Sequence, residues 1–148
     1  MAVLNQTNMT SKVKLIDARG PRFSAVITTL VLAAALVTES ATLIAIQLVV
    51  FAIGAFAGPA KTPYAFLFKK FVKPRLKGEV PVEDARPPQF AQSVGLIFAV
   101  VALAGSLLSI PALFTVAVSF ALFAAFLNAA FNFCLGCEIY LLALRAVK

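Results

Sequence analysis

The chain has 148 residues, of which 61% are hydrophobic and 13% are charged; its mean hydropathy is +0.97 and its net charge is +7. Because soluble domains carry about 25% charged residues, this composition excludes an ordinary soluble protein and indicates one that is integral to a membrane. Histidine is absent, which removes the usual haem ligand, the most common general base and most catalytic zinc sites.

The first apolar stretch follows a polar and basic segment, residues 1–20, which lacks the features of a cleaved signal peptide. We therefore expect the first helix to be retained rather than cleaved, and residues 1–20 to form a cytoplasmic N-terminal segment. Glu39 is the only charged residue between Phe23 and Ala57, and a stretch of this length suits two spans of roughly 20 residues. It divides at Glu39, which predicts a first helix pair within 21–57. Its helices lie near 21–37 and 41–57.

Residues 58–89 form a charged loop between two apolar stretches. Near 64–73 apolar residues recur at helical spacing with lysines opposite, as expected of an amphipathic helix lying in the membrane interface. The apolar face consists of Tyr64, Leu67, Phe68 and Phe71, the opposite face consists of Lys69, Lys70 and Lys73, and Phe66 is the exception. Residues 77–88 carry charges and three prolines, which predicts an exposed linker.

No charged residue occurs between Phe90 and Cys137, so this second stretch also suits two spans. It divides around Pro111, because proline is tolerated at the start of a helix. This predicts a second helix pair within 90–133, with helices near 90–108 and 112–133, followed by a cytoplasmic C-terminal segment at 134–148. The predicted fold class is an all-α integral membrane protein with four transmembrane helices in a single membrane domain.

The basic residues predict the orientation. All 13 fall in three places, at 12–22, 61–86 and 145–148. Because Lys and Arg are enriched in cytoplasmic segments, both termini and the central loop are expected in the cytoplasm. Attraction to anionic lipid headgroups accounts for these charges, so we expect contact with the lipid bilayer and no nucleic-acid binding. The residues expected at the membrane surface are Arg19, Arg86, Lys69, Lys70 and Lys73.

A sequence repeat links the two helix pairs. Residues 17–23 (DARGPRF) and 84–90 (DARPPQF) agree at five of seven positions. This predicts two parallel two-helix repeats related by an axis along the membrane normal. The shared Asp, Pro and Arg suit the start of a helix, with Arg19 and Arg86 reaching lipid headgroups. The alternative is that the two arginines bind an anion there.

Cys134 and Cys137 are the only cysteines, and the corresponding segment of the first half, 58–64, has none. In the reducing cytoplasm both are expected to rest as thiols. One thiolate of such a pair can attack a disulfide or a sulfane sulfur, and the second can resolve the intermediate. We therefore interpret the two residues as a candidate catalytic pair for redox chemistry or sulfur transfer. The alternative is that they are packing residues at a helix end.

Four neighbouring residues are candidates for a supporting role. If the preceding helix continues, the pair lacks the positive helix end that favours thiolates, and Glu138 disfavours them further. If Gly136 breaks the helix and a new one begins near Glu138, that assistance returns. Asn128 and Asn132 lie one turn apart and suit a neighbouring helix or a transported solute. In a continued helix they point roughly opposite to the cysteines.

Metal and cofactor sites are not expected. Zinc and iron–sulfur sites normally need four ligands, and two cysteines supply half, so a metal would require a homodimer or a partner. No charged residue lies deep in a predicted span, which gives little support to a proton relay or to a path for charged solutes.

Segments 17–23, 51–54 (FAIG), 87–92 (PPQFAQ) and above all 131–138 (FNFCLGCE) resemble a bacterial, mainly actinobacterial, membrane family, domain of unknown function 4395 (DUF4395). The resemblance covers nearly the whole chain from about Asp17. It implies a four-helix, multi-pass protein of the bacterial plasma membrane with a terminal C-L-G-C motif. It also implies a sulfurtransferase or thioredoxin-like protein as partner, because such proteins are often encoded near family members.

Three functions remain open at this point, and with them the question of whether the protein is an enzyme. The leading hypothesis is thiol redox or sulfur-transfer chemistry at the cytoplasmic face, through Cys134 and Cys137. The second is a carrier of a small solute or sulfur compound, assembled as a homo-oligomer because four short helices make a thin pathway. The third is a non-catalytic accessory subunit of a larger membrane complex.

Overall fold

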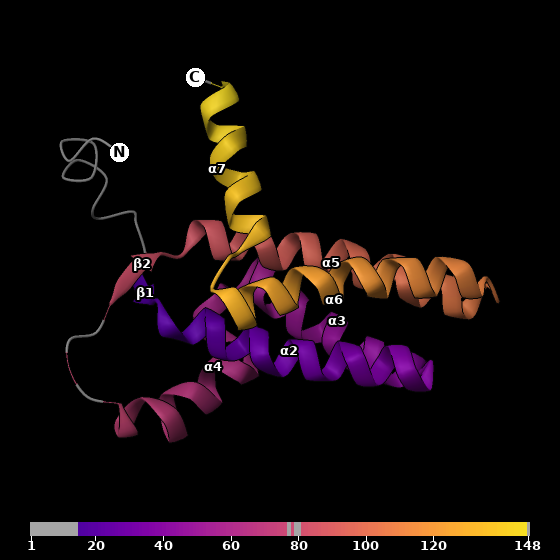
Figure 1. The fold of residues 1–148 in the computed structure, drawn as a ribbon, viewed down its shortest axis with the longest axis horizontal. Coiled ribbons are helices and arrows are strands. Elements are labelled where there is room, and N and C mark those ends of the chain that lie inside the picture. The colour runs from indigo at the N-terminus through magenta and orange to yellow at the C-terminus, as the bar shows by residue number, and fades with distance from the viewer. Residues whose placement is uncertain (1–14, 77, 79–80, 148) are drawn as a thin grey trace.

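The computed structural model describes residues 15–76, 78 and 81–147, so most of the predicted N-terminal segment lies outside the described residues. Four helices run side by side as a bundle (Figure 1): α2 (Arg19–Thr38), α3 (Ala41–Phe56), α5 (Arg86–Leu107) and α6 (Pro111–Phe131). Helices α2, α5 and α6 are long and apolar enough to cross a membrane, and α3 is a shorter apolar helix of 16 residues. The chain is therefore a predominantly helical membrane protein.

Both helix pairs turn where the sequence predicts a division. Glu39 follows α2 in the left-handed conformation, with φ 53°. The Ser40 hydroxyl then accepts a hydrogen bond from the Leu43 N–H at 3.2 Å, which caps the start of α3. Pro111 begins α6, where its missing N–H leaves no helical hydrogen bond unmade.

Two glycines permit close packing of α3 on α5. A Cβ atom at Gly54 would lie 2.7 Å from the Gln92 side chain, and one at Gly95 would lie 2.6 Å from the Phe51 ring. Small residues of this kind let membrane helices approach each other closely. The apolar core lies beyond these contacts, toward the end of the bundle where α2 finishes. Its largest members are Leu32, Ile44, Phe114 and Val118.

Two short strands pair at the opposite end of the bundle. Strands β1 (Leu15–Asp17) and β2 (Val82–Asp84) are antiparallel, with Ile16 opposite Glu83, and they lead into α2 and α5. The sequence predicts an exposed linker over 77–88, and the structure differs by placing part of it in this ribbon. Three-residue strands are too short for alternation of side chains to reveal them in a sequence.

The central loop contains a compact run of short helices rather than one regular helix. These are η1 (Pro59–Lys61), α4 (Pro63–Leu67), the π-helix η2 (Phe68–Val72) and η3 (Lys73–Arg75). Tyr64 and Phe68 are buried, whereas Leu67 and Phe71 are exposed together with Phe66. The expected single apolar face is therefore divided, because a π-helix has more residues per turn than an α-helix and rotates Phe71 away from Phe68.

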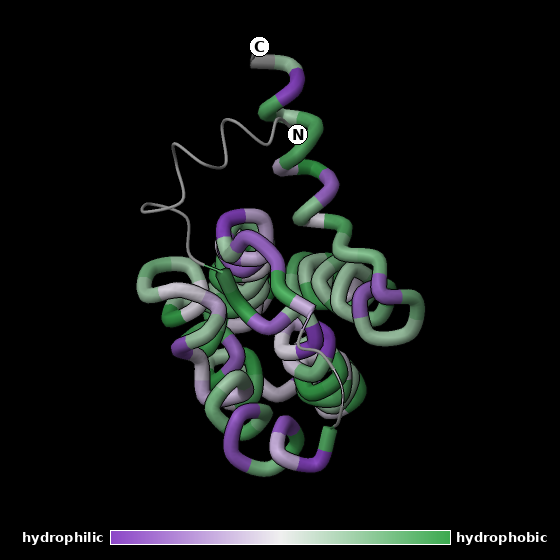
Figure 2. Tube along the Cα trace, turned by 90° about the vertical axis from the view of Figure 1, so that its left-hand side faces the viewer, coloured by the Kyte–Doolittle hydropathy of each residue, from purple (hydrophilic) through white to green (hydrophobic). Residues whose placement is uncertain are grey.

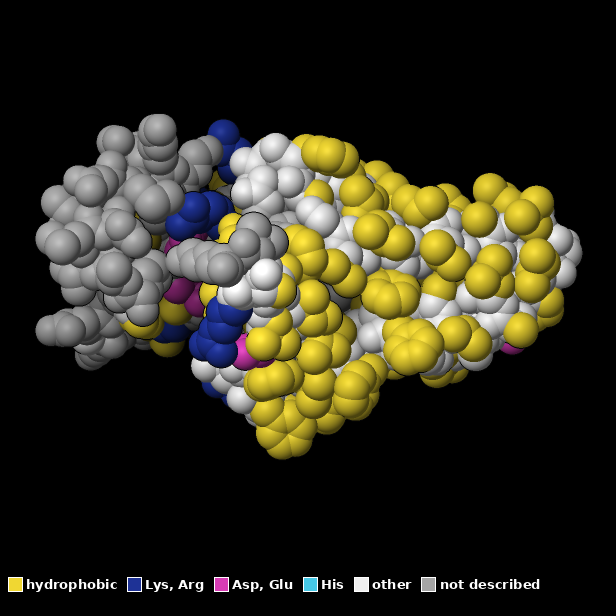
Figure 3. Space-filling model, turned by 90° about the horizontal axis from the view of Figure 1, so that it is seen from above, with side chains coloured by type: hydrophobic (Ala, Val, Ile, Leu, Met, Phe, Trp, Pro, Cys, Tyr) yellow, Lys and Arg dark blue, Asp and Glu magenta, His cyan; other side chains and the backbone are white. Residues whose placement is uncertain are grey.

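The C-terminal segment forms a helix, α7 (Leu135–Val147), which runs across the direction of the bundle (Figure 1). In the view from the strand end, hydrophilic residues occupy much of the ribbon and the adjoining helix starts (Figure 2). Hydrophobic side chains cover most of the bundle's length, and the visible Lys and Arg side chains gather at the strand end (Figure 3). This distribution fits a bundle surrounded by lipid with one charged end.

Candidate functional site

A sharp break between α6 and α7 precedes the C-x-x-C pair. Asn132 follows α6 in the left-handed conformation with φ 55°, and its N–H donates to the Asn128 carbonyl at 3.0 Å. The Phe133 N–H donates to the Leu127 carbonyl at 3.2 Å, so the turn satisfies two of the last carbonyls of α6. The helix therefore ends at Asn132 rather than at Gly136. Asn is one of the few residues that adopt the left-handed conformation readily.

Cys134 and Cys137 lie at the start of α7 and are joined by a disulfide, with their Cα atoms 5.1 Å apart. The Cys137 N–H donates to the Cys134 sulfur at 3.1 Å, and the Glu138 N–H donates to the Cys134 carbonyl at 3.0 Å. The sequence predicts resting thiols, and the structure differs by bridging them. The first turn of a new helix holds the two Cα atoms within the 4.4–6.8 Å that a disulfide usually spans.

Of the two alternatives considered above, the structure therefore matches the one in which the preceding helix breaks and a new helix begins at the pair. The new helix begins at Leu135. Helix α7 has 13 residues, and the Cys137 N–H in its first turn donates to the Cys134 sulfur. Such a helix start favours the charged thiolate form of a cysteine. Glu138 lies in the same turn and opposes this effect.

Helix α7 is seated on the start of α5. A Cβ atom at Gly136 would lie 2.7 Å from Ala91 Cβ, so the two backbones are in close contact. One turn later, the Tyr140 ring packs on Phe90 with the ring centroids 5.4 Å apart. These two contacts fix the helix that carries the cysteines.

Arg22 from α2 holds the end of α6. Its Nε donates to the Ala129 carbonyl at 3.1 Å, and its Nη2 donates to the Ala130 carbonyl at 3.4 Å. The last carbonyls of a helix carry partial negative charge and lack partners within the helix. A guanidinium group is therefore stabilising there, and it fixes the point from which the chain turns toward Cys134.

A cavity of about 390 Å³ borders the disulfide and extends between α2, α5 and α6. All the residues that the sequence analysis assigns to the pair or its support line it: Cys134, Cys137, Gly136, Glu138, Asn128 and Asn132. The sequence analysis places the asparagines opposite to the cysteines only if the helix continues. The helix breaks at Asn132 instead, and both pairs of residues line one cavity.

Other polar residues deeper in the bundle also line this cavity. Ser24 and Thr28, one turn apart on α2, are only 6% and 7% exposed. Gln92 from α5 contributes a buried Oε1 atom that has no hydrogen-bond partner among the residues that the structure describes. A glutamine within an apolar stretch is a signal that could have marked Gln92. The two hydroxyls give no such signal, because Ser and Thr are frequent in membrane helices.

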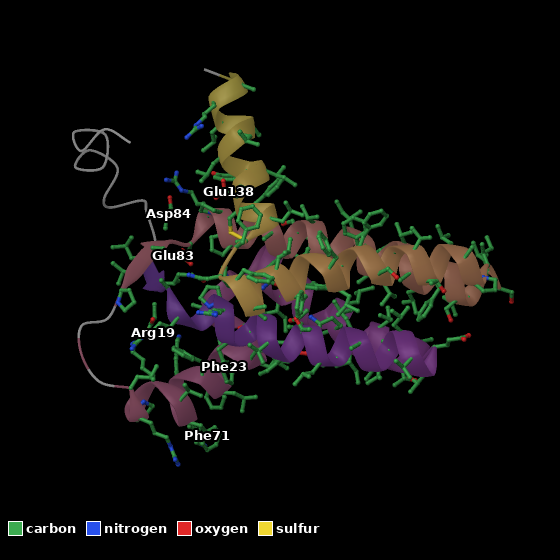
Figure 4. The ribbon with its side chains drawn as sticks, viewed as in Figure 1. Arg19, Phe23, Phe71, Glu83, Asp84 and Glu138 are labelled. Atoms are coloured by element: carbon green, nitrogen blue, oxygen red, sulfur yellow. A yellow bond between two sulfur atoms is a disulfide. The ribbon has the colours of Figure 1, made fainter. Side chains whose placement is uncertain are left out.

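Charged side chains surround the mouth of the cavity. Arg22, Glu83, Asp84 and Glu138 all contribute to its lining, and the two strand residues lie on the ribbon side of the sulfur bridge (Figure 4). Burial raises the pKa of Glu83, and the neighbouring Asp84 charge raises it further. Burial also raises the pKa of Asp84, but hydrogen bonds from Arg86 outweigh this effect and lower it overall.

Arg19 and Arg86, expected at the membrane surface, each bind the aspartate two residues earlier. The Arg19 backbone N–H and Nε donate to Asp17 Oδ1 at 2.9 and 3.0 Å. The corresponding groups of Arg86 donate to Asp84 Oδ1 at 2.9 and 3.1 Å. The side-chain hydrogen bond from Arg19 also lowers the pKa of Asp17. Each guanidinium is thus occupied by a carboxylate of its own chain.

The three lysines expected at the membrane surface lie on the central loop. Lys69 Nζ donates to the Ala60 carbonyl at 3.3 Å, and Lys73 Nζ lies 3.7 Å from an Asp17 carboxylate oxygen. Lys70 Nζ lies 5.5 Å from the centroid of the Phe71 ring. These lysines are not among the residues that line the cavity beside the disulfide.

Within the described part of the chain, no group of three or more His, Cys, Asp or Glu residues is placed to hold a metal ion. The groups that line the cavity are the sulfur pair, the uncharged polar groups behind it and the charges at the mouth.

Comparison with known proteins gives a family. No match to the chain is found among curated proteins or solved structures. The family model described as Domain of unknown function (DUF4395) matches residues 16–145. That range includes the four bundle helices and the C-x-x-C pair. The chain therefore belongs to the DUF4395 family.

Proposed function

We propose that this protein performs thiol redox or sulfur-transfer chemistry at a bacterial plasma membrane, through Cys134 and Cys137. The supporting observation is the setting of the pair. Both sulfurs are half-buried at the start of a helix, they are bridged, and they border a cavity. If the two cysteines were only packing residues at a helix end, they would need neither a shared cavity nor a geometry that allows a disulfide to form.

The reduced pair reacts in two steps. The thiolate of Cys134, stabilised by the start of α7, attacks one sulfur of a substrate disulfide, and the other substrate sulfur leaves as a thiolate. Cys137, deprotonated, then attacks Cys134, closes the intramolecular disulfide and releases the second substrate sulfur. With a sulfane-sulfur donor, the first step leaves a persulfide on Cys134, and attack by Cys137 releases that sulfur as hydrosulfide.

The proposed partner is a soluble sulfurtransferase or thioredoxin-like protein. Cys134 and Cys137 lie at the charged end of the bundle and keep part of their surface exposed. A protein domain can approach this end from water, whereas the apolar sides of the bundle suit lipid. The pair is thus positioned for exchange with a partner's own reactive sulfur.

We propose that all four bundle helices cross the membrane, with the strand end in the cytoplasm. Helix α3 has 16 residues and a length of roughly 24 Å, which a bilayer accommodates by local thinning. Both turns at the far end of the bundle lack basic residues, whereas all the basic residues of the central loop belong to the strand end. This asymmetry is the one that favours a cytoplasmic location.

The two halves of the chain are proposed to be parallel repeats. Asp17 and Asp84 bind their arginines in the same way. The ribbon pairs Leu15 with Asp84 and Asp17 with Val82. If Leu15 corresponds to Val82 and Asp17 to Asp84, exchanging the halves leaves this pairing unchanged. A two-fold axis through the ribbon and along the bundle has that property.

Mass spectrometry of the purified protein tests the proposed chemistry. After mild reduction, the Cys137→Ser variant is treated with a disulfide substrate or a sulfane-sulfur donor. We expect a mixed disulfide or a persulfide on Cys134, and the Cys134–Cys137 bridge when wild-type protein is treated in the same way. The Cys134→Ser variant is the matched control and should be modified more slowly. Free thiols that persist in all three proteins would contradict the proposal.

The cavity also favours a second candidate, an oligomeric carrier of a small solute or sulfur compound. The cavity opens at the charged end of the bundle, and its inner end meets the apolar core. A transport pathway that is closed on one side would have this form. Uptake of labelled thiosulfate into liposomes containing the protein tests this candidate. Uptake no faster than into empty liposomes removes it. Normal cellular function of a variant with both cysteines changed to serine would instead support an accessory subunit.

A further inference from the structure

The cavity continues far behind the disulfide. Its lining on α5 runs from Pro87 at the mouth to Phe98, which is roughly 16 Å along the helix. That distance reaches the middle of a helix that ends at Leu107. Its volume of about 390 Å³ lies within the ~300–1,000 Å³ typical of small-molecule sites. A molecule held there would touch both the sulfur pair and the interior of the bundle.

The deep part of the cavity is apolar with a few uncharged polar groups. The apolar part includes the rings of Phe51 and Phe98, and the polar groups are those of Ser24, Thr28 and Gln92. The charged lining residues are confined to the mouth. A charged group is costly at membrane depth, so the deep part disfavours a sulfur oxyanion. It suits an uncharged, largely apolar molecule that carries a few polar atoms.

The polar groups fit a molecule that changes between hydrogen-bond acceptor and donor. A hydroxyl group can donate or accept, so Ser24 and Thr28 suit either form. The Gln92 Oε1 is buried against α3, where a Cβ atom at Gly54 would lie 2.8 Å from it, so the hydrogen bonds to a bound molecule come from the two hydroxyls. A quinone ring offers carbonyl acceptors when oxidised and hydroxyl donors when reduced.

We propose that this cavity binds the ring of a membrane quinone, which oxidises the Cys134–Cys137 dithiol. The proposal rests on the redox function proposed above and names its electron acceptor. The two S–H bonds break and one S–S bond forms. Two electrons and two protons pass to the quinone, which becomes the quinol. The disulfide returns to the dithiol by the reverse of the exchange proposed above, with a substrate dithiol that approaches from the charged end as the reductant.

The test uses the full-length protein in lipid nanodiscs and a fully substituted quinone, tetramethyl-1,4-benzoquinone, which has no ring position open to thiol addition. The protein is reduced, freed of reductant and mixed with the quinone. Absorbance reports quinol formation, and mass spectrometry reports the disulfide. We expect one quinol for each disulfide formed. Thr28→Val and Ser24→Ala should each slow the reaction about tenfold, the effect of one lost buried hydrogen bond.

Thr29→Val is the matched control, because the neighbouring Thr29 hydroxyl donates to the Ala25 carbonyl at 2.7 Å and is not part of the cavity lining. It should react at the wild-type rate. Exchange with a glutathione redox buffer is measured on every variant and shows that each is folded. Normal exchange without quinone reduction overturns the quinone proposal and leaves the redox function standing. Equal quinone reduction in all variants also overturns it, and absence of both reactions overturns the redox function itself.

Discussion

At the scale of single residues, Cys134 and Cys137 differ in their relation to the helix that they begin. The Cys134 sulfur accepts the Cys137 N–H at 3.1 Å, whereas Cys137 lies within the first turn. Helix N–H groups therefore stabilise negative charge on Cys134 first. This difference supports the proposed roles, with Cys134 as the attacking residue and Cys137 as the resolving residue.

Alkylation rates of the single-cysteine variants test this difference. At pH 7, Cys134 in the Cys137→Ser protein should react with iodoacetamide roughly 2- to 30-fold faster than Cys137 in the Cys134→Ser protein. That range corresponds to a helix-terminus interaction of about 0.3–2 kcal/mol. Both variants should react at equal rates once unfolded in detergent. A faster reaction at Cys137 in the folded protein would reverse the assignment.

Glu83 couples pH to stability at the cavity mouth. Burial and the Asp84 charge raise its pKa, so ionising this carboxyl disfavours the folded state. Compared with the charged form, the neutral Glu83 carboxyl stabilises the folded protein. This stabilisation is complete below the ordinary pKa of about 4.3 and is lost as the pH rises through the raised pKa of the folded protein. The Glu83→Gln variant keeps the shape without the charge. It should match wild type in melting temperature near pH 4 and exceed it near pH 8.

Circular dichroism at the two pH values measures this change, because helix content reports unfolding of the bundle. The prediction concerns the difference between the variant and wild type rather than either melting temperature alone. A difference that stays constant over the pH range would show that Glu83 ionises equally well in the folded and unfolded protein.

At the scale of elements, the four bundle helices are predictable and their ends near the site are not. Long apolar stretches bounded by charges identify the helices, and Glu39 and Pro111 mark the turns. The break at Asn132 depends on a left-handed backbone conformation, φ 55°, that asparagine permits but does not require. Tertiary contacts select that conformation by seating Gly136 on Ala91. The sequence therefore identifies the cysteines and misses the cavity behind them.

The close contact between α7 and α5 predicts that a substitution at Gly136 lowers stability and that a second substitution at Ala91 offsets part of the loss. In Gly136→Ala, the new Cβ would lie 2.7 Å from Ala91 Cβ. Overpacking of this kind costs about 1–3 kcal/mol, which exceeds the roughly 0.5–1 kcal/mol that alanine gains over glycine in a helix. The variant should therefore be less stable than wild type in a thermal unfolding experiment.

Adding Ala91→Gly to Gly136→Ala should recover part of the lost stability, because the second change removes Ala91 Cβ but leaves Ala91 Cα 2.8 Å from the new Cβ. The single Ala91→Gly variant measures how much stability is lost when glycine replaces alanine within α5. If the double variant is no more stable than the sum of the two single effects predicts, the contact between α7 and α5 is not the cause of the loss.

At the scale of the whole molecule, apolar and charged surfaces separate along the bundle axis. The sides of the bundle are hydrophobic, and the end that carries the ribbon, the central loop and α7 bears most of the charges (Figure 3). The sulfur pair lies at that end (Figure 4). The sides of the bundle therefore suit contact with lipid, and the sulfur pair lies at the charged end. The cavity runs from that end into the interior of the bundle.

We propose that Cys134 and Cys137 form a reversible disulfide exposed to the cytoplasm. Labelling with a membrane-impermeant maleimide tests this, in intact cells and in inverted membrane vesicles, before and after mild reduction. We expect labelling of both cysteines only in reduced, inverted vesicles, and its loss on reoxidation. Labelling in intact cells, or a pair that stays unreactive after reduction in inverted vesicles, would contradict it.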